Sequence, residues 1–254
     1  VLVAQQVFGA LGLIMVICGA ALLAVIASRR GRPRIPDTIY PVPHAQAPEL
    51  YRILDQLALR AGLKQRPAAY LLPQDFMNAA TLESKDGPII VLTPSTIRYL
   101  NKRQLTGILA HEIAHIQYRD TLLLQLTIVV HSITQSIAFV AWLMLVLFLP
   151  LLVFSEGVFP FYLLPMLFAA PVASVLLQLA FSRSRELNAD LGAVELTQDP
   201  IGLAEALEKI DRFHSHSLSL LFPFKRPDQR SSVFRSQPNI PTRIRRLRTL
   251  SNNL

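Results

Sequence analysis

Residues 108–125 read ILAHEIAHIQYRDTLLLQ, and this short stretch joins two different kinds of helix. Its first part carries His111 and His115, and positions i and i+4 of a helix lie on the same face. Two imidazoles on one face can both bind a zinc ion at about 2.0–2.1 Å. Its last part opens a long uncharged segment. The stretch therefore predicts a metal-binding helix that continues into an apolar helix.

Glu112 follows His111 on the predicted metal-binding helix. A carboxylate at that position can act as general base on an attacking water and then pass the proton to a leaving amine. The helix is predicted from Lys102 through Tyr118, and its apolar residues would bury it against the rest of the domain. Chance occurrence of this spacing on a surface helix is the alternative.

The composition excludes several classes of protein. Of the 254 residues, 52% are hydrophobic and 17% are charged, with a formal net charge of +8. In ordinary soluble domains about a quarter of the residues are charged, so we expect neither a wholly soluble protein nor a disordered one. The single cysteine, Cys18, excludes an intramolecular disulfide and a cysteine-based zinc cluster. A metal site must therefore use histidine and carboxylate ligands.

Three apolar segments predict membrane-spanning helices, because about 20 apolar residues cross the hydrocarbon core. They cover residues 7–27, 121–150 and 158–181. Short basic loops stay on the cytoplasmic side, and basic residues follow the first segment at 28–34 and flank the other two at Arg119 and Arg183. The last two segments therefore predict a hairpin whose turn, around Ser155-Glu156-Gly157, lies outside. A cleaved signal peptide is the alternative for the first segment.

Polar residues inside the hairpin need partners. His131 is an ionisable group within the second segment, and the third segment carries Ser174 and Gln178. Side chains of this kind form hydrogen bonds between neighbouring membrane helices. We therefore predict that His131 bonds to the third segment rather than serving a separate function.

A catalytic zinc also needs a third protein ligand and an open position. An antiparallel hairpin returns the chain to its starting side, so Glu186 re-enters beside the helix that carries the two histidines. Asp190 follows at i+4 and can accept the outer N–H of a zinc-bound imidazole. Pairing of Glu186 with Arg183 or Arg185 is the alternative.

The polar regions on either side of the hairpin show mixed patterns. We predict helices over residues 48–62, 183–197 and 201–214, with a short basic helix at the end of the chain. Three β-rich runs are predicted at residues 68–72, 79–83 and 89–93. Residues 215–236, which contain Pro223 and Pro227, are predicted to form a long loop.

His-Glu-x-x-His at residues 111–115, the apolar hairpin and Glu-x-x-Ala-Asp at residues 186–190 together resemble the M48 zinc metallopeptidases, in particular the HtpX-like membrane proteases among the gluzincins. The resemblance covers nearly the whole chain. It includes Arg119-Asp120 after the metal-binding helix, and Asn78-Ala79-Ala80-Thr81 at the start of a strand. For Asn78, Ala79 and Ala80 it implies a catalytic strand whose edge pairs with an extended substrate. A turn-forming role for Asn78 is the alternative.

The implied fold class is a mainly α membrane protein with a cytoplasmic α+β zincin-like catalytic domain, built from a small β-sheet and the zinc-site helices. The predicted parts are an N-terminal membrane helix (1–28), the first part of the catalytic domain (29–120), the transmembrane hairpin (121–182) and the second part of the catalytic domain (183–254).

The sequence departs from the family pattern near its end. The family carries Ser/Thr-His-Pro before Arg-Ile, and this chain has Gln237 in place of the histidine, followed by Arg243. Glutamine can donate a hydrogen bond to an oxyanion but cannot carry charge, so Gln237 and Arg243 are both oxyanion candidates. Family members also show two N-terminal spans, whereas one is visible here.

The resemblance implies a zinc-dependent endopeptidase with one Zn²⁺ per chain that degrades misfolded or damaged membrane proteins. It would be an integral protein of the bacterial cytoplasmic (inner) membrane with its active site on the cytoplasmic side. The expected partners are unfolded or membrane protein substrates and the lipid bilayer. Nucleic acid is not expected, because the basic residues lie beside the predicted spans. An intramembrane site-2-type protease and an inactive scaffold of the same fold are the alternatives.

Overall fold

The computed structural model describes residues 38–84, 86–154, 163–221 and 239–252. These residues form two compact units. One unit draws on the described residues between 123 and 180, and the other on the described residues between 38 and 122 and between 181 and 252. The predicted first span, the turn of the hairpin and Gln237 lie outside the described residues.

The second unit contains a four-stranded sheet with the order β1-β2-β4-β3. The strands are β1 (Tyr40–Pro41), β2 (Ala68–Leu71), β3 (Ala79–Ser84) and β4 (Gly87–Leu92). β2 pairs with β4 in parallel, whereas β1 with β2 and β3 with β4 are antiparallel. β3 is therefore an edge strand of this sheet. The three predicted strands are confirmed to within two residues, and β1 is too short to show a strand pattern in the sequence.

The helices of this unit include those predicted near residues 48, 102 and 201 and at the end of the chain, whereas η1 and α3 were not predicted from the sequence. They are the 3-10 turn η1 (His44–Gln46) and the helices α2 (Pro48–Arg60), α3 (Pro94–Tyr99), α4 (Lys102–Gln117), α7 (Pro200–Leu221) and α8 (Ile240–Ser251). α7 runs beyond its predicted end, so the predicted loop is wrong for residues 215–221. The physical reason is that this stretch contains no Gly or Pro before Pro223.

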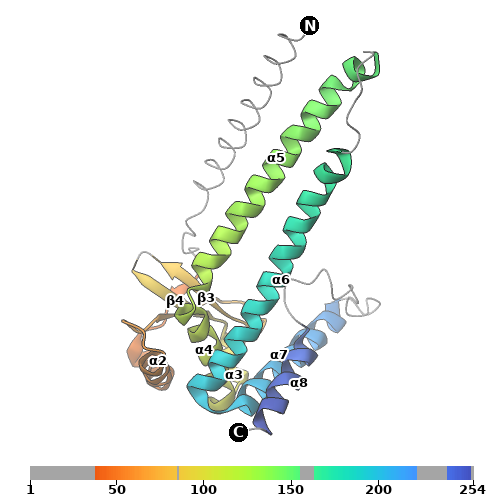
Figure 1. Cartoon of the computed structure of the whole chain (residues 1–254). Coiled ribbons are helices and arrows are strands. Elements are labelled where there is room, and N and C mark those ends of the chain that lie inside the picture. The colour runs from red at the N-terminus through yellow and green to blue at the C-terminus, as the bar shows by residue number, and fades with distance from the viewer. Residues whose placement is uncertain (1–37, 85, 155–162, 222–238, 253–254) are drawn as a thin grey trace. The chain divides into compact units, whose positions relative to one another are not determined.

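The position of α4 is set at its start and by its packing. Asn101 caps it with a reciprocal pair of hydrogen bonds: the Gln104 backbone N–H donates to the Asn101 side chain at 2.9 Å, and the Asn101 N–H donates to the Gln104 side chain at 3.2 Å. α4 then runs beside β3 (Figure 1). At Gly107 it comes so close to α7 that an added Cβ would lie 2.9 Å from the Leu203 backbone. Glycine at this position allows the two helices to touch.

α4 does not continue into the apolar helix, contrary to the prediction. It ends at Gln117, and α5 (Asp120–Phe154) begins after a two-residue turn. Arg119 in this turn has a φ of 53°, a left-handed conformation that few residues other than glycine adopt. The turn redirects the chain and brings the Asp120 carboxylate back toward the end of α4, where it contacts His115.

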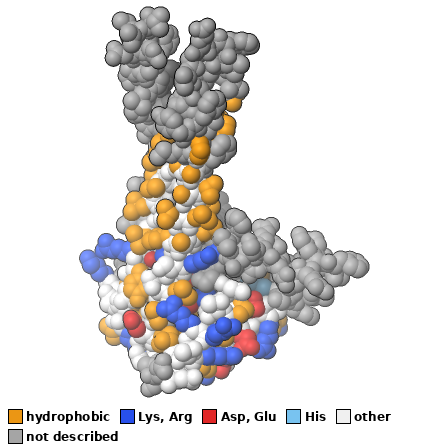
Figure 2. Space-filling model, turned by 45° about the vertical axis from the view of Figure 1, so that its right-hand side comes forward, with side chains coloured by type: hydrophobic (Ala, Val, Ile, Leu, Met, Phe, Trp, Pro, Cys, Tyr) orange, Lys and Arg blue, Asp and Glu red, His pale blue; other side chains and the backbone are white. Residues whose placement is uncertain are grey.

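The other unit consists of the apolar parts of α5 and α6 (Leu163–Thr197). Among the described residues, the window Leu126–Leu143 in α5 is long and apolar enough to cross a membrane, by length and composition. Hydrophobic side chains gather over these helices, whereas charged side chains gather over the unit that contains the sheet (Figure 2). His131 Nδ1 lies 3.1 Å from the Ser174 hydroxyl, which confirms the predicted bond between the two segments.

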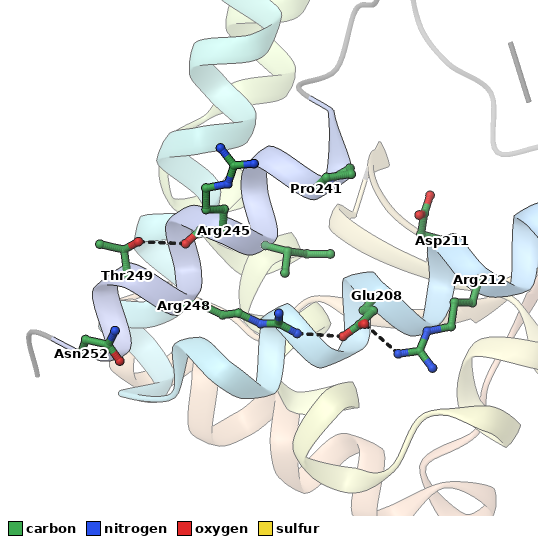
Figure 3. Close-up of a pocket in the computed structure, with 9 residues that line it drawn as sticks. Glu208, Asp211, Arg212, Pro241, Arg245, Arg248, Thr249 and Asn252 are labelled. Carbon is green, nitrogen blue, oxygen red and sulfur yellow. Dashed lines mark hydrogen bonds and ion pairs between the residues drawn. The ribbon is translucent and has the colours of Figure 1, made fainter. Parts of the chain in front are cut away.

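α7 and α8 enclose a groove of about 550 Å³ between charged side chains (Figure 3). Arg248 of α8 donates to Glu208 of α7 at 3.0 Å, and Arg212 donates to the same carboxylate at 2.7 Å. None of the predicted site residues lines this groove. The chemistry predicted from the sequence belongs elsewhere, at the meeting of α4, α6 and α8.

Candidate metal centre

Three predicted metal ligands converge in the unit that contains the sheet. The ligand atoms of His111, His115 and Glu186 all lie within 4.8 Å of one another. The two Nε2 atoms are 3.2 Å apart, and the Glu186 carboxylate oxygens lie 3.6 Å from that of His111 and 3.8 Å from that of His115. α4 supplies both imidazoles on one face, and α6 supplies the carboxylate.

These separations fit a tetrahedral ion. Ligand atoms about 2.0–2.1 Å from a tetrahedral zinc lie about 3.3 Å apart, close to the observed values. Two imidazoles and one carboxylate also form a donor set that catalytic zinc sites use, with one position left for water or substrate. The residues present therefore fit a zinc ion.

His111 is held by a chain of buried charges. Its Nδ1 lies 3.1 Å from Asp190 Oδ1, as expected for a carboxylate that orients an imidazole. Arg243 of α8 in turn grips Asp190 with two hydrogen bonds, of 2.6 and 2.8 Å, and places its Nη1 3.2 Å from Glu186. His111, Asp190 and Arg243 are each less than 7% exposed. Arg243 thus holds both carboxylates in place from the C-terminal helix.

His115 has a second chain of the same kind. Its Nδ1–H donates to Asp120 Oδ2 at 2.6 Å, and the Arg185 Nε lies 3.3 Å from the same oxygen. Asp120 is 3% exposed, and the Arg185 Nε is buried without a hydrogen-bond partner of good geometry. Each imidazole is therefore backed by a carboxylate, and each carboxylate by a guanidinium.

The buried charges favour a positive ion between the ligands. Burial alone lowers the pKa of His111, but its hydrogen bonds to Asp190 and Glu186 outweigh burial and raise the pKa from 6.5 to about 9. For the carboxyl group of Asp190, burial raises the pKa, but hydrogen bonds from His111 and Arg243 hold it below its ordinary value. Burial also raises the pKa of Glu186, but the hydrogen bond and the charge of His111 outweigh burial and lower it below its ordinary value. The site stabilises a positive charge at the position where a metal ion would lie.

The formal charge of the cluster agrees with a divalent cation. Four carboxylates face two guanidinium groups, which leaves a formal charge of −2 when both imidazoles are neutral. The groups counted are Glu112, Asp120, Glu186 and Asp190 against Arg185 and Arg243. A Zn²⁺ ion would neutralise this charge.

Glu112 lies next to the ligands and is 7% exposed. The Thr81 hydroxyl of β3 donates to its Oε2 at 2.8 Å and lies 3.1 Å from its backbone carbonyl oxygen. The candidate base is thus held by the edge strand of the sheet.

The other predicted residues lie along this edge strand. Ala79 and Ala80 are in β3 and half-buried, and Asn78 precedes it with an exposed side chain. The backbone N–H of Asn78 points inward, 2.8 Å from the Thr96 hydroxyl and 3.0 Å from that of Thr93. Asn78 therefore presents its side chain outward at the start of the strand.

Four residues of the site, Thr81, Asp120, Arg185 and Arg243, make contacts that are missing from the sequence-based predictions. Asp120, Arg185 and Thr81 all stand in motifs quoted for the family resemblance or beside them, yet nothing in those motifs indicates which side chain each would contact. The useful signal for Asp120 is its place five residues after His115, within reach if the helix ends between them. A further contact that the sequence does not indicate is that of His214, whose Nε2 lies 2.8 Å from the Met77 carbonyl oxygen.

The sequence has relatives among known proteases. It matches the profile of Peptidase family M48 over residues 44–251. A Protease HtpX homolog of Paenarthrobacter aurescens is 37% identical over 177 residues, which cover 68% of this chain and 57% of the relative. A Protease HtpX homolog of Burkholderia multivorans is 35% identical over 175 residues, which cover 66% and 57%. The chain thus spans less than three fifths of the length of these curated relatives.

The fold has a known counterpart as well. A crystal structure of S. mikatae Ste24p matches with a TM-score of 0.62 at 19% sequence identity, over 97% of this chain and 64% of that chain. This likeness concerns the arrangement of mostly helical elements around a small sheet. Together with the profile match over most of the sequence, it confirms the resemblance inferred from the motifs. The chain belongs to peptidase family M48.

Proposed function

We propose that this chain is a zinc-dependent endopeptidase that acts at a membrane. The observation that carries the proposal is the convergence of His111, His115 and Glu186 within 4.8 Å, with the buried residue Glu112 directly after His111 on α4. The protease names of its relatives support the same activity.

The residues of the chain divide the chemistry between them. A zinc ion held by the three ligands would supply a Lewis acid for the scissile carbonyl. Glu112 takes the proton from the attacking water and delivers it to the leaving amine. Asp190 and Asp120 keep the imidazoles oriented, and Arg243 holds Asp190 and Glu186 in place.

The substrate is an extended polypeptide. β3 lies at the edge of the sheet beside α4, and in the part of the chain that the structure describes no strand pairs with its outer side, so this side can pair with a peptide through main-chain hydrogen bonds. We infer that the substrates are misfolded or damaged membrane proteins, and that the site faces the cytoplasm. The apolar window in α5 and the basic residues flanking the predicted hairpin support this location. α4 lies outside this window, which disfavours an intramembrane site.

Metal analysis and peptide hydrolysis by the detergent-purified protein test the proposal. We expect one zinc per chain and cleavage of an unfolded substrate such as casein. Glu112→Gln removes the base and no ligand, so it should keep the zinc and lower kcat by at least about 10²-fold. His115→Ala should lose zinc and activity together.

Glu205→Gln is the matched control, because Glu205 lies on the surface of α7, 3.6 Å from Arg103. It should leave both zinc and kcat unchanged. A full equivalent of zinc in His115→Ala would disprove the ligand assignment. A wild-type protein that binds zinc and cleaves nothing would instead favour a scaffold of the same fold.

A further inference from the structure

Thr81 is the point where the edge strand touches the candidate base. Its hydroxyl lies 2.8 Å from Glu112 Oε2 and 3.1 Å from the Glu112 carbonyl oxygen, so it contacts both the carboxylate and the backbone of the same residue. We propose that Thr81 is a positioning residue that fixes the Glu112 carboxylate for proton transfer. The inference rests on the proposed peptidase function.

The strand presents Thr81 to α4 by simple alternation. Successive side chains of a strand point to opposite faces. Ala79, two residues earlier, packs against the main core, whereas Leu82 packs against the separate cluster of Ile39, Ile89 and Val91. Thr81 therefore faces the same side as Ala79, toward α4. Thr81 pairs with Ile90 of β4, and this register fixes the position of Thr81 along the sheet.

Threonine suits this role because its side chain is stiff. A β-branched residue in a strand has few χ1 choices, so the hydroxyl is held where the strand places it. A glutamate side chain, in contrast, has three rotatable bonds and would sample several positions. A hydrogen bond to Oε2 restricts that freedom and leaves Oε1 as the oxygen that Thr81 does not contact. A base needs this precision, because proton transfer requires an approach of about 2.6–3.2 Å.

The contact also links substrate binding to the base. The same strand is proposed to pair with the extended substrate, and Thr81 stands within it. A peptide that pairs with β3 orders the strand and, through Thr81, the carboxylate of Glu112. The effect of losing the hydroxyl should therefore appear in kcat more than in KM, because peptide pairing uses the backbone of β3.

Substitutions of Thr81 with and without a hydroxyl test this role. Thr81→Val keeps the shape and removes the donor, and Thr81→Ser keeps the donor. We expect Thr81→Val to retain its zinc, to change KM less than about twofold and to lower kcat about 10-fold or more, as for loss of a hydrogen bond to a charged group. Thr81→Ser should recover most of that loss. Thr106→Val is the matched control, because the Thr106 hydroxyl donates to the Lys102 carbonyl oxygen of the same helix.

A second measurement does not depend on turnover. The thermal midpoint of the zinc-loaded protein in detergent is compared for Thr81→Val, Glu112→Ala and the double variant. If the hydroxyl acts through Glu112, Thr81→Val shifts the midpoint in the wild-type background and has little further effect beside Glu112→Ala. Additive shifts would overturn the inference.

The outcomes separate this inference from the proposed function. If the wild type cleaves peptides and Thr81→Val keeps its full kcat, the inference on Thr81 is wrong and the peptidase proposal stands. Equal loss of kcat in Thr81→Val and Thr81→Ser would also overturn it, because a structural defect would then be responsible. If the wild type cleaves nothing, the peptidase proposal fails, and the thermal comparison alone decides whether Thr81 and Glu112 are coupled.

Discussion

Each imidazole of the candidate metal centre, that of His111 and that of His115, is supported by its own carboxylate and its own arginine. The carboxylates come from different places, Asp190 from α6 and Asp120 from the start of α5. Both lie on the Nδ1 side of their imidazoles, which leaves Nε2 of each ring directed toward the metal position. The two carboxylates thus select the same tautomer for both ligands.

Asp120→Asn should weaken zinc binding. An amide in place of the carboxylate can still accept a hydrogen bond but no longer makes the imidazole a stronger ligand, and changes of this kind cost about 10–100-fold in metal affinity. We expect the zinc Kd to rise by that factor in competition with a chromophoric chelator. Asp55→Asn, which removes a carboxylate from a surface pair with Arg66, is the control and should leave the Kd unchanged. An unaltered Kd in Asp120→Asn would show that the contact is only structural.

At the scale of elements, α7 depends on the residue that precedes it. Asp199 stands before Pro200 and accepts a hydrogen bond from the Gly202 N–H at 3.0 Å, as an N-cap does. It also pairs with Arg103 of α4 at 2.6 and 2.7 Å. One partly exposed carboxylate therefore both starts α7 and ties it to the helix that carries the histidines.

Asp199→Ala should destabilise the protein at neutral pH by about 1 kcal/mol, because a cap is lost. The corresponding fall in thermal midpoint is about 2–4 °C. Hydrogen bonds from Arg103, and then from backbone N–H groups, hold the pKa of Asp199 below 3.8. A lowered pKa gives stability that is present above the ordinary value and lost as the pH falls through the folded-state value. The gap between wild type and variant should therefore be full at pH 7 and shrink below pH 3.8.

Asp199→Asn separates the two contributions of this residue. Asparagine caps helices about as well as aspartate, so this variant should lose less stability than Asp199→Ala. Measuring all three proteins in detergent at each pH cancels acid effects that they share, such as loss of zinc. A gap between wild type and Asp199→Ala that stays constant from pH 7 to pH 3 would argue against the charged form as its source.

At the scale of the whole molecule, the orientation in the membrane decides which substrates the site can reach. Basic residues at 28–34, Arg119 and Arg183 predict that the unit with the metal centre is cytoplasmic and that the segment around Glu156 is outside. We expect a tag inserted at Glu156 to react with a membrane-impermeant reagent on intact cells. A tag after Leu254 is the control and should react only after the cells are opened. Reaction of the Glu156 tag from the cytoplasmic side alone would overturn the hairpin.

Local sequence patterns determined much of the secondary structure and of the candidate ligand set of this protein. The helical spacing of His111 and His115, the carboxylate at 186 and the helix and strand positions depend on residues a few places apart, so they can be predicted from the sequence. The hairpin argument also predicted that Glu186 lies beside the histidines, and the structure brings them together.

Apart from Asp190, which its spacing from Glu186 indicated, the side chains that surround that centre were decided by tertiary structure alone. The turn at Arg119 depends on a left-handed residue that sequence patterns do not mark, and it brings Asp120 to His115. Thr81 reaches Glu112 because the parallel pairing of β2 with β4 leaves β3 at the edge beside α4. Arg243 lies on α8, far from α4 and α6 in the sequence, and pairs with Asp190. These contacts join segments distant in sequence, so they follow from packing and strand order rather than from any local periodicity.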